Sequence, residues 1–138
     1  MMTMIVPSRL LRRALVLDAL ASGATGLLTA SGARILAGFC NLPESLLTYT
    51  GLSLLPFAAI VGLMARRDTV PAAIVWAIVA YNALWSFDSL ALLISGWIAP
   101  NAFGYVFIAG QAFVVAVLAE CQYIGLRRSR TRESAVGA

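Results

Sequence analysis

The sequence contains no histidine and only two cysteines among its 138 residues, and charged residues make up only 12% of it. Without histidine the chain lacks the commonest general base, the Ser-His-Asp triad and the usual zinc ligand. Cys40 and Cys121 form no CxxC pair, and we expect them at opposite ends of the molecule, too far apart for a disulfide. These absences predict a protein that is not an enzyme and has no cofactor.

Hydrophobic residues, by contrast, make up 61% of the chain, above the roughly 45–50% of soluble domains. They form four apolar stretches, at about 14–37, 46–65, 71–95 and 102–125. Each stretch supplies the ~20 residues that a helix needs to cross a ~30 Å hydrocarbon layer. A soluble bundle would need polar helix faces, and residues 52–64 show none. The sequence therefore predicts an all-α fold with one transmembrane domain over residues 1–138.

The arginines predict the orientation of this domain, because basic residues near short loops stay in the cytoplasm. Nine of the ten precede the first stretch, separate the second from the third, or follow the fourth, and only Arg34 falls elsewhere. Both termini are thus predicted to be cytoplasmic, and short connections predict an up-down-up-down four-helix bundle with a disordered tail at about 129–138. The basic segments suit anionic lipid headgroups, but they are too scattered for nucleic acid.

Local signals predict where the helices end. Gly38 is expected to end the first helix, and Asn41 with Glu44 resembles a capping box for the second. Asp68 or Thr69 is expected to cap the third helix, Gly96 to end it, and Asn101 to open the fourth. Arg12, Arg13 and residues 19–21 resemble a cleavable signal peptide. Asp18 interrupts its apolar region, and this favours a retained helix.

The first helix has a polar stripe and a small-residue face. Asp18, Ser22, Thr25 and Thr29 follow helical spacing along the stripe. The adjoining face consists of Ala19, Gly23, Gly26, Ala30, Ala33 and Ala37. Small residues allow membrane helices to approach closely. The pattern therefore predicts a central packing helix, or alternatively a stripe that lines a substrate path.

Polar residues also lie deep in the other helices. Asn82 and Gln111 are expected at the same mid-membrane level, where a hydrogen bond between them would join the third and fourth helices. Pro56 predicts a kink in the second helix, with Ser53 bonding a freed carbonyl group. Both features have a structural reading, and the kink has an alternative reading as a gate hinge.

Charged residues at membrane depth are functional candidates because burying them is costly. Arg34, Glu44 and Asp88 are expected at similar depths near the outer face, and we predict that they cluster. Such a cluster would be either a neutralised contact between three helices or a site for an anion, a cation or a proton. Asp18 and Glu120 are expected near the cytoplasmic surface, solvated or paired with arginines.

Three segments resemble small, uncharacterised four-helix inner-membrane proteins of bacteria. They are residues 11–18, 82–85 and 122–128, which read LRRALVLD, NALW and QYIGLRR. The resemblance implies a location in the bacterial cytoplasmic membrane and no activity.

Two functional classes follow from these patterns. The first is a non-catalytic bundle that acts as a partner subunit, a scaffold or a lipid-interacting protein. The second is a small oligomeric transporter or channel that uses Asp88 and Arg34. Transport predicts that Asp88, Asn82 and Gln111 touch a continuous polar cavity, whereas a structural role predicts that they are buried against one another. The expected partners are the lipid bilayer and either further copies of the chain or another membrane protein.

Overall fold

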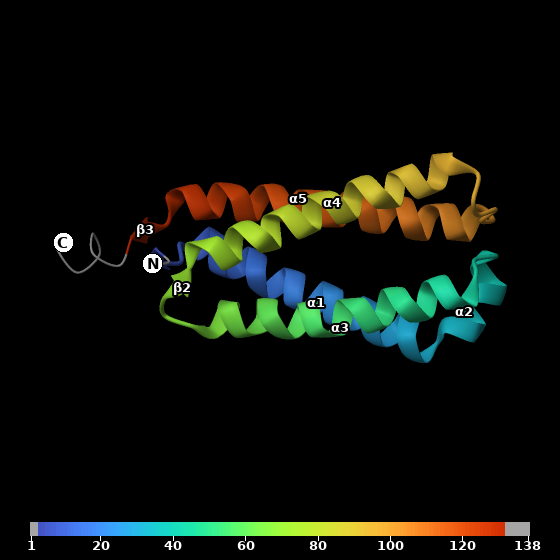
Figure 1. Cartoon of the computed structure of the whole chain (residues 1–138), viewed down its shortest axis with the longest axis horizontal. Coiled ribbons are helices and arrows are strands. Elements are labelled where there is room, and N and C mark those ends of the chain that lie inside the picture. The colour runs from blue at the N-terminus through green and yellow to red at the C-terminus, as the bar shows by residue number, and fades with distance from the viewer. Residues whose placement is uncertain (1–2, 132–138) are drawn as a thin grey trace.

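The computed structural model describes residues 3–131 and is all-helical apart from three very short strands (Figure 1). Five helices lie in this part of the chain: α1 (Arg9–Ser31), α2 (Ala33–Cys40), α3 (Glu44–Arg66), α4 (Ala72–Ser95) and α5 (Ala102–Arg128). By length and composition, α1, α3, α4 and α5 are able to cross a membrane.

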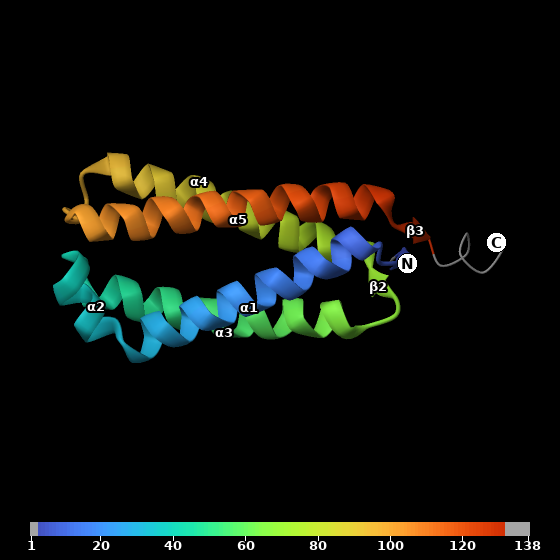
Figure 2. The same cartoon turned by 180° about the vertical axis from the view of Figure 1, so that it is seen from behind.

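The four long helices form two pairs. Helix α1 packs most extensively on α3, α4 packs on α5, and α1 joins the pairs through its contact with α5. Helix α1 begins and α5 ends at the same end of the molecule, whereas α2 lies at the opposite end (Figures 1 and 2). At the α2 end the two pairs are joined again, because the Asn101 side chain donates to the Phe39 carbonyl and the Asn41 side chain donates to the Ala99 carbonyl.

The contact between α1 and α3 depends on small residues. Gly26 of α1 lies against Leu54 and Gly51 of α3, and a Cβ atom added at Gly51 would fall on the backbone nitrogen of Ala30 and on Thr29 Oγ1. Gly23 faces Ala58 at ordinary van der Waals distance. The small-residue face predicted for the first helix therefore packs a neighbouring helix, as expected.

The first apolar stretch is two helices rather than the one predicted over 14–37. Helix α1 begins earlier, at Arg9, because the Ser8 hydroxyl accepts a hydrogen bond of 3.2 Å from the Leu11 N–H. It ends at Ser31, and after Gly32 the chain continues as α2. Gly38 lies inside α2, which instead ends at Asn41 in the left-handed conformation, with φ 54°.

Two further capping predictions are wrong. Asn41 caps the end of α2 rather than the start of α3, which has Pro43 at its N-cap. Helix α4 begins after Pro71, without a side-chain cap from Asp68 or Thr69.

The predictions around the α4–α5 connection are confirmed. Gly96 ends α4 with φ 80°, and the Asn101 side chain accepts a 3.0 Å hydrogen bond from the Gly104 N–H at the start of α5.

A small sheet closes the end where α1 begins. Strand β1 (Met4–Val6) lies between β2 (Val70–Pro71) and β3 (Arg130–Thr131), and both pairings are antiparallel. Ile5 and Val70 are buried in the same core as Leu11 and Leu126. Residues 130–131 were predicted to belong to a disordered tail, but they pair with β1. Residues 132–138 of that predicted tail lie outside the described residues.

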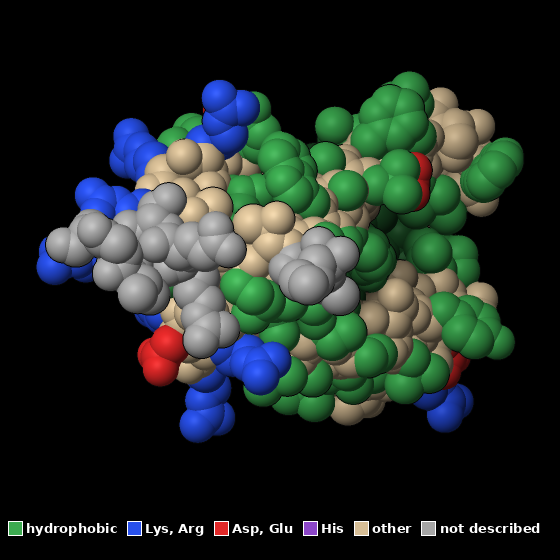
Figure 3. Space-filling model, turned by 60° about the vertical axis from the view of Figure 1, so that its left-hand side comes forward, with side chains coloured by type: hydrophobic (Ala, Val, Ile, Leu, Met, Phe, Trp, Pro, Cys, Tyr) green, Lys and Arg blue, Asp and Glu red, His purple; other side chains and the backbone are tan. Residues whose placement is uncertain are grey.

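The exterior has a basic end and an apolar remainder (Figure 3). Arginines gather where α1 begins and α5 ends, and hydrophobic side chains cover much of the rest of this face. Leu17, Leu20 and Leu27 of α1 are each about 60% exposed, on the side of the helix away from α3.

Candidate functional site

A fully buried carboxylate lies between α1, α4 and α5. Asp18 Oδ2 accepts hydrogen bonds from Asn82 Nδ2 at 2.6 Å and from Gln122 Nε2 at 2.7 Å. Asp18 Oδ1 accepts one from the Ser22 hydroxyl at 2.9 Å, and Asn82 also donates to Gln122 Oε1 at 2.9 Å. We call these four residues the Asp18 cluster.

The Asp18 cluster contains no cation. Within residues 3–131, no arginine forms an ion pair with Asp18, so three uncharged donors surround the carboxylate instead. Asp18 and Ser22 share a face of α1 because they are one helical turn apart. A buried polar group that is fully hydrogen-bonded stabilises a particular packing of its helices.

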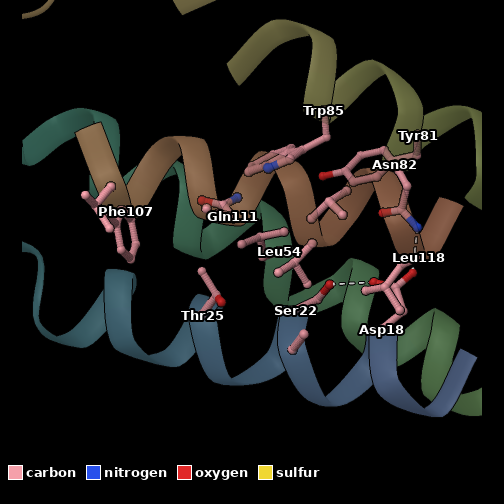
Figure 4. Close-up of a pocket in the computed structure, with 15 residues that line it drawn as sticks. Asp18, Ser22, Thr25, Leu54, Tyr81, Asn82, Trp85, Phe107, Gln111 and Leu118 are labelled. Atoms are coloured by element: carbon pink, nitrogen blue, oxygen red, sulfur yellow. Dashed lines mark hydrogen bonds between the residues drawn. The ribbon is translucent and has the colours of Figure 1, made fainter. Parts of the chain in front are cut away.

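Three residues of the Asp18 cluster, Asp18, Ser22 and Asn82, line a cavity of about 340 Å³. The residues that line it include Asp18, Ser22 and Thr25 of α1, Asn82 and Trp85 of α4, and Gln111 of α5 (Figure 4). The remaining wall is apolar and includes Leu54, Phe107, Val115 and Leu118. This volume falls in the range of about 300–1,000 Å³ that is typical of small-molecule sites, which are likewise mostly apolar with a few polar groups.

Two of the residues that line the cavity carry a polar group without a partner in the described part of the chain. The Trp85 indole Nε1 is buried and unpaired. The Gln111 amide likewise makes none of the hydrogen bonds found within residues 3–131. A second cavity, of about 50 Å³, shares Trp85, Phe107 and Gln111 and extends toward Leu42. Because nearly all buried polar groups in proteins are hydrogen-bonded, an unpaired buried N–H group requires an explanation.

An aromatic row connects the cavity to α3. Phe57 stacks on Tyr81 with ring centroids 4.1 Å apart, and Tyr81 stacks on Trp85 at 5.9 Å. The Tyr81 hydroxyl and the Ser53 hydroxyl are 3.3 Å apart, within hydrogen-bonding distance. Ser53 thus pairs with a side chain of α4, and the prediction that it bonds a carbonyl freed by Pro56 is wrong.

The cavity reaches the outer surface beside α5. Val106, Gly110 and Val114 lie one turn apart on one face of α5, all three are exposed, and all three line the cavity. A Cβ atom added at Gly110 would meet nothing within 4 Å. The absence of a side chain at Gly110 therefore leaves this margin of the cavity open.

The structure separates the predicted partners Asn82 and Gln111. Both line the cavity, but Asn82 bonds Asp18 and Gln122, so the predicted hydrogen bond to Gln111 is wrong. Equal depth along the helix axes did not settle which helix faces meet. Thr25 also lines the cavity, as one of the two readings of the α1 stripe predicted.

The charged residues at membrane depth are placed differently from the prediction. Arg34, Glu44 and Asp88 are all exposed on the outside of the helices, and no ion pair joins them in the described residues. Asp18 was expected to be solvated or paired with arginine, and this prediction is wrong. Three polar side chains enclose its carboxylate instead. Glu120 is exposed. Of the acids in the long helices, Asp18 alone lines the cavity.

Gln122 is the site residue that the sequence analysis did not identify. It is completely buried and donates to Asp18. The signal was present, because the α5 face that carries Gln111, Val115 and Leu118 reaches Gln122 after one more turn.

Comparison of the chain with known protein families, with curated proteins and with solved structures finds no match. The chemistry of the site therefore rests on its own geometry. Within residues 3–131, no three Cys, Asp or Glu side chains lie close enough together to hold a metal ion. What the cavity offers is an apolar enclosure with hydrogen-bonding groups at a few points of its wall.

Proposed function

We propose that the protein is a multi-pass integral protein of the bacterial inner membrane that is not an enzyme and binds a small lipid-soluble molecule in the cavity beside the Asp18 cluster. In this proposal α1, α3, α4 and α5 cross the bilayer in an up-down-up-down arrangement with both termini in the cytoplasm. Their length, their apolar exterior and the arginines at one end support it. The sequence led us to expect a partner subunit, a scaffold or a lipid-interacting protein. The proposal selects the lipid-interacting role.

The observation that carries the proposal is the cavity of about 340 Å³, whose lining includes the Gln111 amide, without a hydrogen bond in residues 3–131. A packing helix that served only to hold the bundle together would gain stability by filling this space, because cavities weaken cores. The opening at Gly110 faces the region that lipid chains would occupy, so a lipid-soluble molecule would have a direct route from the bilayer.

The alternative, an oligomeric transporter or channel that uses Asp88 and Arg34, requires more than one chain. Both residues lie on the outside of the single chain, and neither lines the cavity. Only an interface that covers them would bring them into a pathway.

The test is to close the cavity at Gly110. In Gly110→Phe the new ring occupies the space beside α5 where no atom lies within 4 Å of the added Cβ, so the fold is retained and the cavity is blocked. Gly38→Phe is the matched control, because a Cβ at Gly38 also meets nothing, but Gly38 lies on α2 outside the cavity. Native mass spectrometry of protein purified in mild detergent measures the small molecules that remain bound.

We expect wild type and Gly38→Phe to retain the same bound mass and Gly110→Phe to lose it. If the bound mass is the same in Gly110→Phe, the molecule sits elsewhere and the proposed site is wrong. If none of the three proteins retains a molecule other than annular lipid, the proposed binding function is contradicted.

A further inference from the structure

We infer that the molecule bound in the cavity is an uncharged lipid whose head both donates and accepts a hydrogen bond, as the hydroxyl group of a lipid alcohol does, and that the Gln111 amide and the Thr25 hydroxyl bind this head. This inference rests on the proposed binding function and adds the chemical class of the ligand. It follows from which polar atoms of the lining a ligand is able to reach and which of them are already paired.

Most polar groups around the cavity are beyond the reach of a ligand. Asp18 is completely buried and Asn82 almost so, and the two are hydrogen-bonded to each other. Ser22 is also buried, and its hydroxyl donates to Asp18. The Trp85 indole nitrogen is buried as well. Among the described residues that line the cavity Asp18 is the one charged side chain, so the surface offered to a ligand is uncharged.

Gln111 and Thr25 carry the polar atoms that a ligand is able to reach. Neither the Gln111 amide nor the Thr25 hydroxyl forms a hydrogen bond within residues 3–131. In the same residues the Trp85 nitrogen is the one unpaired polar side-chain atom that is buried, so the polar atoms of Gln111 and Thr25 keep accessible surface. Figure 4 shows both side chains at the cavity, Gln111 from α5 and Thr25 from α1. The Tyr81 hydroxyl, by contrast, lies 3.3 Å from that of Ser53.

The two side chains determine the kind of head that the ligand presents. The Gln111 amide has two N–H donors and one carbonyl acceptor, and the Thr25 hydroxyl both donates and accepts. A head that only accepts, such as an ether oxygen, would pair with an N–H group and leave the Gln111 carbonyl oxygen without a donor from the ligand. A hydroxyl head supplies both functions. A site that uses both therefore discriminates against an analogue that lacks one of them.

The rest of the wall determines the body of the ligand. Side chains such as Leu54 and Leu118 offer only hydrocarbon. The margin at Gly110 is open, because a Cβ atom added there would meet nothing within 4 Å. Gln111 follows Gly110 in α5, so a head bound at Gln111 lies near this opening and an apolar tail is able to leave through it into the bilayer. A long-chain alcohol represents this class of molecule.

The experiment compares three radiolabelled probes on protein reconstituted in nanodiscs, with empty nanodiscs as the background. The probes are a long-chain alcohol, its methyl ether, which accepts a hydrogen bond but donates none, and an alkylammonium cation of equal chain length. One hydrogen bond to the ligand is worth up to about tenfold in affinity. We expect wild type to bind the alcohol several-fold to about tenfold more tightly than the ether. The cation should bind most weakly.

Two variants locate this preference. Gln111→Leu removes the amide and keeps a side chain of similar size, and the Thr25 hydroxyl that remains is able to donate to either probe, so the alcohol and the ether should bind equally. Thr25→Val is nearly isosteric and should weaken binding of the alcohol several-fold. Thr48→Val is the matched control, because Thr48 lies on α3 outside both cavities, and it should bind as wild type does.

A photolabelling measurement places the head directly. A long-chain alcohol with a diazirine next to its hydroxyl end should label α1 near Thr25 and α5 near Gln111, as mapped by mass spectrometry of the digested protein. Excess alcohol should suppress this labelling at several-fold lower concentration than excess ether. Labelling confined to outward-facing side chains such as Leu20 would place the alcohol in the surrounding lipid and contradict the inference.

The outcomes separate the inference from the function on which it rests. Equal binding of alcohol and ether by wild type, both lost in Gly110→Phe, would contradict the inferred head and leave the binding function in place. Tighter binding of the cation than of the alcohol, abolished by Asp18→Asn, would also overturn the inference. Failure of all three probes to bind above empty nanodiscs would contradict the binding function itself.

Discussion

Asp18 shows how a carboxylate can be buried among helices without a counter-ion. An isolated charge in an apolar interior is very costly, but hydrogen bonds to the charged group offset much of this cost. Ser22, Asn82 and Gln122 supply three such bonds from three different helices. The Asp18 cluster therefore links α1 to α4 and α5.

Replacing Asp18 by leucine should destabilise the fold. Asp18→Leu leaves Gln122 Nε2 and the Ser22 hydroxyl without their acceptor, and each buried unsatisfied group costs about 1–3 kcal/mol. Asp18→Asn should be much closer to wild type, since its carbonyl is able to accept from Asn82 and Gln122 while its N–H group donates to Ser22. The free energy of unfolding in mixed detergent micelles measures the difference.

Asp88→Leu is the matched control for this comparison. Asp88 is exposed and lies outside the Asp18 cluster, so its loss should leave the free energy of unfolding within about 0.5 kcal/mol of wild type. Equal stability of Asp18→Leu and Asp88→Leu would show that the Asp18 cluster does not hold the helices together.

At this scale the sequence predicted a shared polar face of α1, but it predicted neither the burial of Asp18, which was expected to be solvated or paired with arginine, nor the partners of these residues. The spacing of Asp18, Ser22 and Thr29 placed them on one face, and all three are buried. The sequence gives no information on how each helix rotates about its axis relative to its neighbours. Gln111 was predicted as the partner of Asn82 only because the two lie at the same depth in the membrane. In the packed structure Asn82 instead bonds Asp18 and Gln122.

At the scale of helices, α1 and α3 form the closest pair because glycines remove side chains from their contact. At Gly51 the backbone of α1 near Ala30 lies so close that no side chain would fit. Gly62, farther along the same helix, faces Ala19 with room for a methyl group. An added Cβ there would lie 3.7 Å from the Ala19 Cβ. The two glycines of α3 therefore have different roles in one interface.

Alanine at these two positions should have opposite effects. Gly51→Ala forces α1 and α3 apart, and overpacking of this kind costs about 1–3 kcal/mol. Gly62→Ala adds a contact without a clash and gains up to about 1 kcal/mol of helix propensity. Thermal unfolding of the two variants beside wild type checks the prediction, and a stable Gly51→Ala protein would show that the close approach near Ala30 is not required.

The sequence predicted the four long helices because an apolar stretch and its flanking residues are enough to indicate each of them. Gly96 and Asn101 mark their boundaries through conformations and caps that neighbouring residues determine. The break at Gly32 was missed because an apolar stretch gives no sign of where a helix bends back. The two-residue strands β2 and β3 were also missed, since their pairing with β1 joins segments far apart in the chain.

At the scale of the whole molecule, both ends of the bundle are tied together, and the arginines gather at one of them. At the α2 end the Asn101 side chain donates to the Phe39 carbonyl, and the Asn41 side chain donates to the Ala99 carbonyl. The sheet joins the start of α1, the α3–α4 connection and the end of α5. The Arg12 side chain of the same end donates to the Ala65 carbonyl at 2.6 Å and the Arg67 carbonyl at 3.0 Å, where α3 terminates. In the proposed orientation this basic end is the cytoplasmic one, and the cavity lies between the two tied ends of the bundle.

Cysteine labelling in intact bacteria tests this orientation of the whole molecule. In a Cys40→Ala/Cys121→Ala background, Trp97→Cys places a thiol on the α4–α5 connection and Asp68→Cys places one between α3 and β2, and both positions are exposed. Because basic residues are retained on the cytoplasmic side, an impermeant maleimide should label Trp97→Cys in intact cells and Asp68→Cys only after the membrane is opened. The reverse labelling pattern would show that the protein has the opposite orientation in the membrane. Labelling of both positions in intact cells would exclude a single transmembrane orientation.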